Sequence, residues 1–252
     1  MIDFKQEFQN IEEFLKSSLS SHKELSINLA NVELNRDDAK MLSSALENCQ
    51  NLLSLRLVIK SEQIRMKGIQ LLSSSLTKCS YISNLYLEFK QNEISDIGAQ
   101  YLGSALGSYS NLQNLTLYID FCCMQCKGAT GLASGLSKYS NLQSFKLNIQ
   151  GNYIGPKGVT ELGSCLEKCI NLSKLTINLN FTNIGSKGVS ALGSALAKCS
   201  NLTNFKTWPQ GNPEKPWIRG YLRIWFQFIK KQKYLNFKIT FATKSNQSKR
   251  NI

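Results

Sequence analysis

Residues 141–170 and 171–200 read "NLQSFKLNIQGNYIGPKGVTELGSCLEKCI" and "NLSKLTINLNFTNIGSKGVSALGSALAKCS", and their likeness decides the fold. Both stretches contain the pattern IGxKGVxxLGSxLxKC at matching positions. In the first stretch, apolar side chains alternate with polar ones over residues 145–149, which is typical of a strand with one buried face. Over residues 159–166 the apolar side chains follow helical spacing instead. Each stretch therefore predicts a strand, a turn and a helix.

The same unit recurs through most of the chain with a period of thirty residues. Cuts at residues 21, 51, 81, 111, 141 and 171 produce six units that align without a gap. Two helix positions hold leucine in every unit: Leu42, Leu72, Leu102, Leu132, Leu162 and Leu192, and then Leu46, Leu76, Leu106, Leu136, Leu166 and Leu196. A third position holds cysteine or tyrosine: Cys49, Cys79, Tyr109, Tyr139, Cys169 and Cys199. Such a period predicts a solenoid of stacked units.

The spacing of strands and helices predicts how this solenoid curves. Adjacent parallel strands lie about 4.8 Å apart, whereas adjacent helices need about 8–10 Å. The array must therefore bend, with a concave parallel sheet inside and helices on the convex side, which is an α/β horseshoe. Small residues at one helix position let neighbouring helices approach closely: Ser43, Ser73, Gly103, Ala133, Gly163 and Gly193.

The pattern LxxLxLxLxxNxIxxxGxxxLxxxLxxC, from Leu142 to Cys169, resembles the leucine-rich repeat of the ribonuclease-inhibitor type. The resemblance covers about residues 21–241, with units slightly longer than usual, as in some protist repeat families. Members of this family commonly bind proteins, and related repeats are sometimes fused to kinases or act as GTPase activators. The resemblance therefore implies a binding scaffold without naming its ligand.

The glycine-rich stretch "GNYIGPKG", residues 151–158, invites comparison with a phosphate-binding loop. It recurs as "FTNIGSKG", "QNEISDIG" and "FCCMQCKG" in other units, and Lys157 is followed by Gly158 where a P-loop has Ser or Thr. We therefore interpret the glycines structurally. Gly155 permits the turn after the strand, and Gly158 lets the helix begin close to its neighbour.

Composition and charge restrict the class of protein. The 252 residues are 42% hydrophobic, and no window approaches the length of a signal peptide core or a membrane span. We expect a cytoplasmic or cytoskeletal protein that is not secreted. The net charge of +13 is concentrated at the end of the chain, because residues 201–252 hold 11 Lys+Arg against 1 Asp+Glu.

The two ends of a solenoid need caps, because each end exposes the core. Residues 1–20 are predicted to form an N-terminal capping helix whose apolar stripe is Phe4, Phe8, Ile11, Leu15 and Leu19. Residues 21–200 hold the six repeats. Residues 201–241 are expected to form a degenerate basic and aromatic repeat with a final capping strand, and residues 242–252 a flexible basic tail.

Residues that alternate with the buried strand positions are expected to face the concave side. The candidate partner-binding residues on that face are Arg56, Lys60, Tyr86, Glu88, Lys90, Tyr118, Asp120, Lys146, Asn148, Lys206 and Trp208. Tyr86 and Tyr118 come from adjacent strands and are of a residue type that anchors interfaces. The alternative is a solvated sheet face with no partner.

The C-terminal region offers a second candidate surface. Its basic and aromatic residues are Arg219, Arg223, Trp225, Lys230, Lys231 and Lys233. One interpretation is a C-terminal cap alone. The other is a docking patch for RNA or for an acidic protein, and contact with a membrane surface is a third.

No arrangement of residues in the sequence suggests catalysis. The only histidine, His22, falls on a core position of the first unit. The stretch "CCMQC", residues 122–126, contains a C-x-x-C pattern but lacks the further ligands that zinc needs. Cys122 instead occupies the position of Asn92 and Asn152 in other units. We expect no enzyme activity, no metal and no cofactor.

The sequence thus favours a protein-binding scaffold or adaptor that uses the concave face. The expected partner is a protein of acidic character, with the chain as one subunit of a larger assembly. The alternative is a tether to nucleic acid or to an acidic surface through the C-terminal region. A GTPase-activator-like regulator rests on the family resemblance alone.

Overall fold

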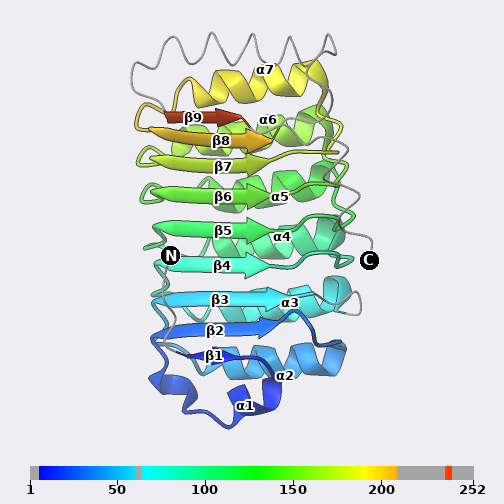
Figure 1. Cartoon of the computed structure of the whole chain (residues 1–252), viewed down its shortest axis with the longest axis vertical. Helices are drawn as coiled ribbons and strands as arrows, with labels where there is room; N and C mark the ends of the chain where they lie inside the picture. Colours follow the sequence, from blue (N-terminus) through cyan, green and yellow to red (C-terminus); the bar gives the residue numbers. More distant parts are fainter. Residues whose placement is uncertain (1–5, 61–63, 209–235, 240–252) are drawn as a thin grey trace.

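A computed structural model describes residues 6–60, 64–208 and 236–239 of the chain. Nine parallel strands form one sheet in chain order, and helices cover one of its faces (Figure 1). The strands are β1 (Glu7–Phe8), β2 (Glu24–Leu29), β3 (Ser54–Ile59), β4 (Asn84–Glu88), β5 (Asn114–Tyr118), β6 (Ser144–Asn148), β7 (Lys174–Asn178), β8 (Asn204–Trp208) and β9 (Asn236–Ile239). The helices are α1 (Ile11–Leu15), α2 (Arg36–Glu47), α3 (Arg65–Leu76), α4 (Ser95–Leu106), α5 (Cys126–Leu136), α6 (Gly155–Lys168) and α7 (Gly185–Leu196).

The register of the sheet follows the thirty-residue period. Leu25 of β2 pairs with Leu55 of β3, Leu55 with Leu85, and so on through Phe205 of β8. Each of these side chains is buried, and the helix leucines pack against them from the convex side. The predicted α/β solenoid, with one strand and one helix in each unit, is confirmed.

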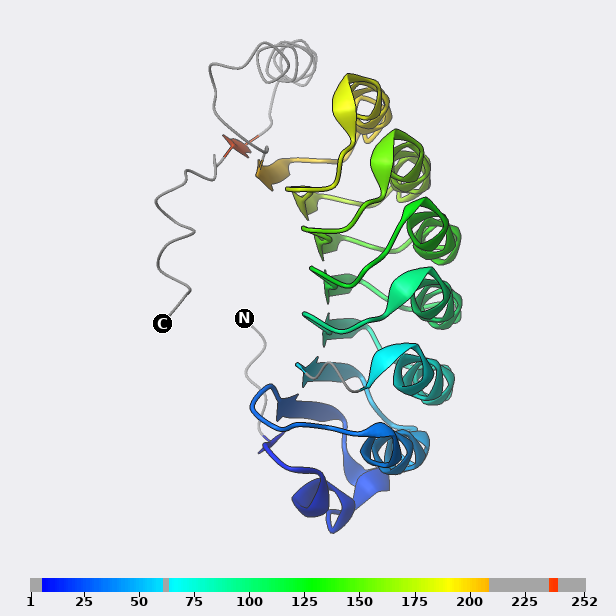
Figure 2. The same cartoon turned by 90° about the vertical axis from the view of Figure 1, so that its right-hand side faces the viewer.

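The sheet lies on the inside of the curve and the helices on the outside (Figure 2). Small residues allow the helices to approach one another. A Cβ on Gly103 of α4 would collide with the backbone carbonyl of Gly131 in α5. At the equivalent position in α2, Ser43 Oγ donates a hydrogen bond of 2.6 Å to the carbonyl oxygen of Leu71 in α3.

The N-terminal cap differs from the single helix predicted over residues 1–20. β1 adds a two-residue strand beside β2, and α1 has only five residues before a 3-10 turn at Leu19–Ser21. Phe14 is the fully buried residue of α1, whereas Leu15 is 37% exposed. Asn10 explains the late start of the helix, because its side chain accepts a hydrogen bond from the Glu13 backbone N–H.

The cap buries its aromatic residues together with the only histidine. The rings of Phe8 and Phe14 lie 5.4 Å apart, and His22 lies 5.7 Å from Phe8. Ser17 Oγ hydrogen bonds to the His22 ring nitrogen at 2.8 Å. Burial lowers the pKa of His22, so this residue is a neutral packing element of the cap.

The C-terminal end is described in part. β9 pairs with β8, with Phe237 in register with Phe205. Of Trp208 the structure describes only the backbone, within β8. Phe4 of the predicted capping stripe, the predicted C-terminal patch from Arg219 to Lys233 and the predicted tail at 242–252 all lie outside the described residues.

Candidate functional site

Six of the predicted concave residues form one cluster, here called the concave cluster. They are Arg56, Tyr86, Glu88, Lys90, Tyr118 and Lys146. Five of them come from β3 to β6, where alternate residues point away from the helices, and Lys90 follows the end of β4. All six are only partly exposed, so the cluster packs against itself.

Two tyrosine rings lie at the centre of the concave cluster, with cations around them. The ring centroids of Tyr86 and Tyr118 are 5.7 Å apart. Arg56 Cζ lies 5.1 Å from the Tyr86 centroid, on one side of the pair. Lys90 Nζ and Lys146 Nζ lie 4.7 Å and 5.0 Å from the Tyr118 centroid. These distances allow cation–π attraction, which holds the long side chains over the rings.

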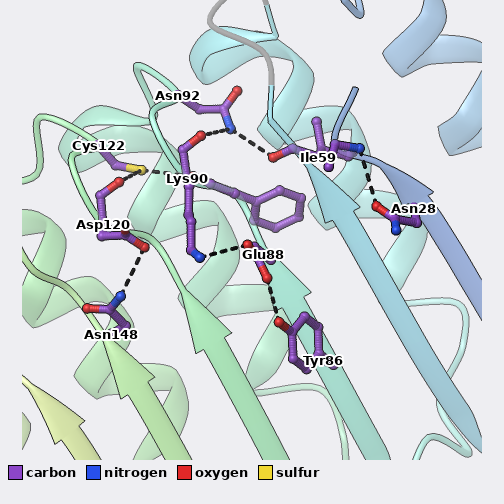
Figure 3. A network of polar contacts seen from close by, with 11 residues as sticks. Asn28, Ile59, Tyr86, Glu88, Lys90, Asn92, Asp120, Cys122 and Asn148 are labelled. Carbon is purple, nitrogen blue, oxygen red and sulfur yellow. Dashed lines mark hydrogen bonds and ion pairs between the residues drawn. The ribbon is translucent and has the colours of Figure 1, made fainter. Parts of the chain in front are cut away.

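Glu88 lies between Tyr86 and Lys90 and contacts both (Figure 3). Its carboxylate accepts a hydrogen bond from the Tyr86 hydroxyl and forms an ion pair of 2.8 Å with Lys90 Nζ. Burial raises the pKa of Glu88, but the bonds from Lys90 and Tyr86 outweigh burial and lower it. Burial and the nearby carboxylate raise the pKa of Tyr86 well above its usual value. At neutral pH the glutamate is therefore ionised and the tyrosine protonated.

Glu7 completes the cluster at its N-terminal side, and the sequence analysis did not identify it. Arg56 Nη1 lies 3.3 Å from Glu7 Oε1 and 3.3 Å from Ser26 Oγ. Glu7 belongs to β1, which has only two residues. Apolar periodicity cannot signal so short a strand, so no sequence pattern could have placed this carboxylate beside Arg56.

Beyond the concave cluster, two asparagine amides donate hydrogen bonds to neighbouring side chains on the same face. Asn148 Nδ2 donates to Asp120 Oδ1 at 3.1 Å, and Asn178 Nδ2 donates to Gln150 Oε1 at 2.9 Å. Asp120 and Asn148 of the predicted set thus pair with each other, outside the concave cluster. Lys60 and Lys206 are exposed and belong to neither group.

Cys122 has the structural role predicted for it. Its Sγ donates to the carbonyl oxygen of Phe89 at 3.0 Å, just as Asn152 Nδ2 donates to that of Ile119 at 2.8 Å. Burial raises the pKa of Cys122 to about 12, so the thiol stays protonated. Throughout residues 6–60, 64–208 and 236–239, no three His, Cys, Asp or Glu side chains gather as metal ligands would. The helices in these ranges are too short or too polar to cross a membrane.

Comparison with known proteins points to one repeat family. A family model described as a leucine-rich repeat matches residues 171–193. A sequence comparison with curated proteins found no match.

Three solved structures resemble the chain in part. The actin-binding site 2 of leiomodin-1 is 13% identical, covers 73% of this chain and 96% of its own, and has a TM-score of 0.47. The C-terminal domain of Caenorhabditis elegans tropomodulin is 8% identical, covers 66% of this chain and 95% of its own, and scores 0.46. A chain of the yeast Rad7 and Elc1 complex is 15% identical, covers 95% of this chain and 72% of its own, and scores 0.35.

Proposed function

We propose that the chain, whose solenoid and family-model match are those of a leucine-rich repeat protein, is a protein-binding scaffold that uses its concave face. The observation that carries this proposal is the concave cluster, in which two tyrosines and an arginine are already held in place. Tyrosine and arginine are among the residues that most often dominate the energetics of interfaces. A partner that covers Tyr86 and Tyr118 would therefore bury the side chains of this face that contribute most to binding free energy.

The order of the concave cluster favours tight binding. Immobilising a long side chain at an interface costs roughly 0.5–1.5 kcal/mol. Arg56 is held by Glu7, and Lys90 is held by Glu88, before any partner arrives. These side chains therefore lose much of their conformational entropy when the protein folds, and they lose less when a partner binds.

The charges of the cluster favour an acidic partner. Arg56 and Lys90 have carboxylate partners, but within the described ranges Lys146 forms no salt bridge. The neighbouring amides of Asn148 and Asn178 are neutral. An acidic side chain of the partner, placed over Tyr118, would meet Lys146 as an unpaired charge.

Lysine crosslinking with mass spectrometry, on the protein purified from its own cells, tests the proposal. Concave lysines are Lys60, Lys90, Lys146 and Lys206, and lysines near helix ends are Lys78, Lys138, Lys168 and Lys198. Crosslinks from the concave set to one protein are expected. Crosslinks from the helix-end set alone would overturn the proposal.

A pair of double variants makes the test specific. Tyr86→Ala with Tyr118→Ala should abolish those crosslinks and weaken binding of the purified partner by at least about 100-fold, since two anchors are lost. Tyr81→Ala with Tyr101→Ala is the matched control, because these tyrosines lie outside the concave cluster. Equal binding by both double variants would refute a concave binding site.

A further inference from the structure

The repeats themselves divide into a nearly neutral part and a basic part. Residues 21–120 hold 9 Lys+Arg against 10 Asp+Glu, whereas residues 121–200 hold 8 against only 2. The positive charge is therefore not confined to the last fifth of the chain, as the division at residue 200 suggested. It begins with the loop after β5 and extends through α5, α6 and α7.

Three of these lysines occupy one position in successive units. Lys127, Lys157 and Lys187 lie in the first turns of α5, α6 and α7, and all three are exposed. The start of a helix carries partial positive charge, so a cation there is unfavourable for stability. None of the three forms a salt bridge to another described residue, and these first turns contain no acidic residue.

Three large aromatic side chains are exposed on the loops that precede the same helices. Phe121, Tyr153 and Phe181 are 47%, 68% and 39% exposed. Phe121 and Phe181 both have a φ of 56°, in the left-handed region where a bulky residue is disfavoured. Glycine would suit these two positions better, as it does at Gly151 in the unit between them. Stability alone does not explain these phenylalanines.

The ring of Phe121 lies over Gly151, and the residue is 47% exposed. A Cβ on Gly151 would collide with Cδ1 and Cε1 of Phe121 and would lie 3.0 Å from Cγ. An edge-on approach to the Cδ1–Cε1 bond would leave Cγ much farther away than those two atoms. The glycine therefore supports one face of the ring, and the exposed part of the ring is a flat platform.

The loops that carry these residues are joined to one another along the edge where the strands end (Figure 1). Phe121 N donates to the carbonyl oxygen of Gln150 at 2.8 Å, and Gly151 N donates to that of Asn180 at 2.9 Å. The backbones of Phe121 and Phe181 are thus two strand spacings apart, about 10 Å. Aromatic platforms and lysines are held at fixed intervals on one rigid edge.

We propose that this edge binds single-stranded nucleic acid. The loop edge consists of Phe121, Lys127, Tyr153, Lys157, Phe181 and Lys187. Proteins that hold single strands combine a positive track for phosphates with aromatic faces on which bases stack. The loop edge has both features, and Lys157, Lys187 and the two phenylalanines cost stability in the free protein. The loop edge shares no residue with the concave cluster or with residues 201–252.

The orientation of Phe121 favours a base over the other anionic partners. A membrane-binding edge would need rings that protrude into lipid, whereas this ring lies flat on a glycine backbone. An acidic protein segment would satisfy the lysines but would leave the ring face opposite Gly151 without a planar partner. The shared chemistry of RNA and DNA, a phosphodiester with a planar base, fits both features.

Fluorescence anisotropy with the full chain tests the proposal. The probes are labelled uridine and thymidine oligonucleotides of roughly 16 residues, since single-strand sites span about 4–16 nucleotides. Lys127→Ala, Lys157→Ala and Lys187→Ala together should reduce the slope of log K against log salt by about 2. Phe121→Ala with Phe181→Ala should weaken binding at least about tenfold with little change in that slope. RNA bound more tightly than DNA would indicate contacts to the 2′-hydroxyl.

A matched control separates this edge from general positive charge. Lys78→Ala, Lys138→Ala and Lys168→Ala also remove three exposed lysines, but at the opposite ends of the helices. This control triple should keep most of the affinity. Equal losses in both triples, or no binding of either oligonucleotide, would overturn the proposal. Binding of a polyglutamate peptide or of phosphatidylserine vesicles through the same residues, without binding of oligonucleotides, would overturn it as well. Circular dichroism of each variant checks that the fold is intact.

Discussion

The edge where the helices end and the loop edge both carry lysines and aromatic residues, but these residues affect stability in opposite directions. At the edge where the helices end, the cysteine or tyrosine after each of the helices α3 to α7 donates a side-chain hydrogen bond back to the preceding unit, whereas Cys49 donates to Ala45 of its own helix. This edge is called the helix-end edge. Cys79 donates to the carbonyl oxygen of Leu46 at 3.5 Å, and Tyr109 donates to that of Leu76 at 2.9 Å. The series continues from Tyr139 to Leu106, from Cys169 to Leu136 and from Cys199 to Leu166. Lysines near these helix ends oppose the negative end of the helix dipole.

At the helix-end edge, every one of these features stabilises the fold. Beneath the loop edge, the buried side chains of Asn152 and Cys122 also stabilise the fold through hydrogen bonds. The exposed residues of the loop edge do not. Lysines lie at the positive ends of helices, and phenylalanines adopt left-handed backbone conformations. The difference teaches where to search for function in a repeat protein, because features that cost stability need a reason outside folding.

Alkaline pH should destabilise the helix-end edge most. Burial raises the pKa of Cys79 and Cys199 to about 11, and that of Cys49 and Cys169 to about 12. The folded pKa exceeds the ordinary value of 9.0, so this stability is complete below about pH 9 and is lost as pH rises toward 11–12. Each buried thiol should then cost about 1.4 kcal/mol per pH unit.

Urea unfolding at about pH 8 and about pH 10.5 measures this loss, which we expect to reach several kcal/mol. The double variant Cys79→Ala with Cys199→Ala should show a shallower dependence on pH, because two of the titrating groups are gone. A midpoint that does not change with pH would show that the thiols ionise freely in the folded protein.

Asn152→Ala should have the largest effect of any single substitution considered at the loop edge. Asn152 Oδ1 accepts from the backbone N–H groups of Cys122 and Met124 at 3.2 and 3.0 Å, and its Nδ2 donates to Ile119 and Ile149. Leaving buried groups without partners costs about 1–3 kcal/mol each. We expect a loss of roughly 3–4 kcal/mol in the free energy of unfolding.

Asn171→Ala is the control for Asn152→Ala at the helix-end edge. Asn171 Nδ2 donates to the carbonyl oxygen of Ser140 at 2.8 Å, but this bond is exposed to water. Its loss should cost about 1 kcal/mol or less. Urea denaturation of both variants measures their free energies of unfolding. Equal losses would contradict the prediction that Asn152→Ala destabilises the protein more than Asn171→Ala does.

The sequence predicted most of the fold because the period is undisturbed from residue 21 to residue 200. Alternation in the strands predicted that Tyr86 and Tyr118 lie side by side, and their rings are 5.7 Å apart. Leucine spacing likewise predicted the helices. In these elements the apolar pattern of the sequence has the same period as the backbone geometry, so the pattern predicts the secondary structure.

The sequence could not predict features that depend on contacts between units. Glu7 reaches Arg56 only because a two-residue strand joins the sheet. The cysteines and tyrosines recur at one position of the period, but the pattern does not predict their hydrogen bonds to the preceding helix. A pattern of hydrophobicity does not predict the left-handed backbone conformation of Phe121, so it does not predict the loop edge.

Gly151→Ala should destabilise the protein more than Gly155→Ala does. Both glycines have positive φ, at 70° and 63°, so an alanine should cost about 1–2 kcal/mol at either position. At Gly155 a Cβ would meet nothing within 4 Å, whereas at Gly151 it would strike the Phe121 ring. We expect roughly 1 kcal/mol of additional loss at Gly151.

A double-mutant cycle checks this explanation. If the ring causes the extra loss, Phe121→Ala in the Gly151→Ala background should recover about 1 kcal/mol. Thermal unfolding of the two single variants and the double variant measures the coupling. Strict additivity of the two substitutions would mean that the ring does not rest on the glycine.

The smallest effect is the sharpest test of the two edges, because α6 carries one lysine at each end. Lys157→Gln removes a cation from the positive end and should stabilise the protein by about 0.3–1 kcal/mol at low salt. Lys168→Gln removes one from the negative end and should destabilise it by a similar amount. At about 1 M salt both changes should nearly vanish, because the Debye length falls to about 3 Å.

If the two variants change the free energy of unfolding in the predicted opposite directions, Lys157 destabilises the fold. The stabilised variant should then bind oligonucleotides more weakly, and the destabilised one should bind them as before, which is the stability–function trade-off expected of a binding residue. If Lys157→Gln instead destabilises the chain, the lysine has a structural role, and its position on the loop edge no longer supports a phosphate contact.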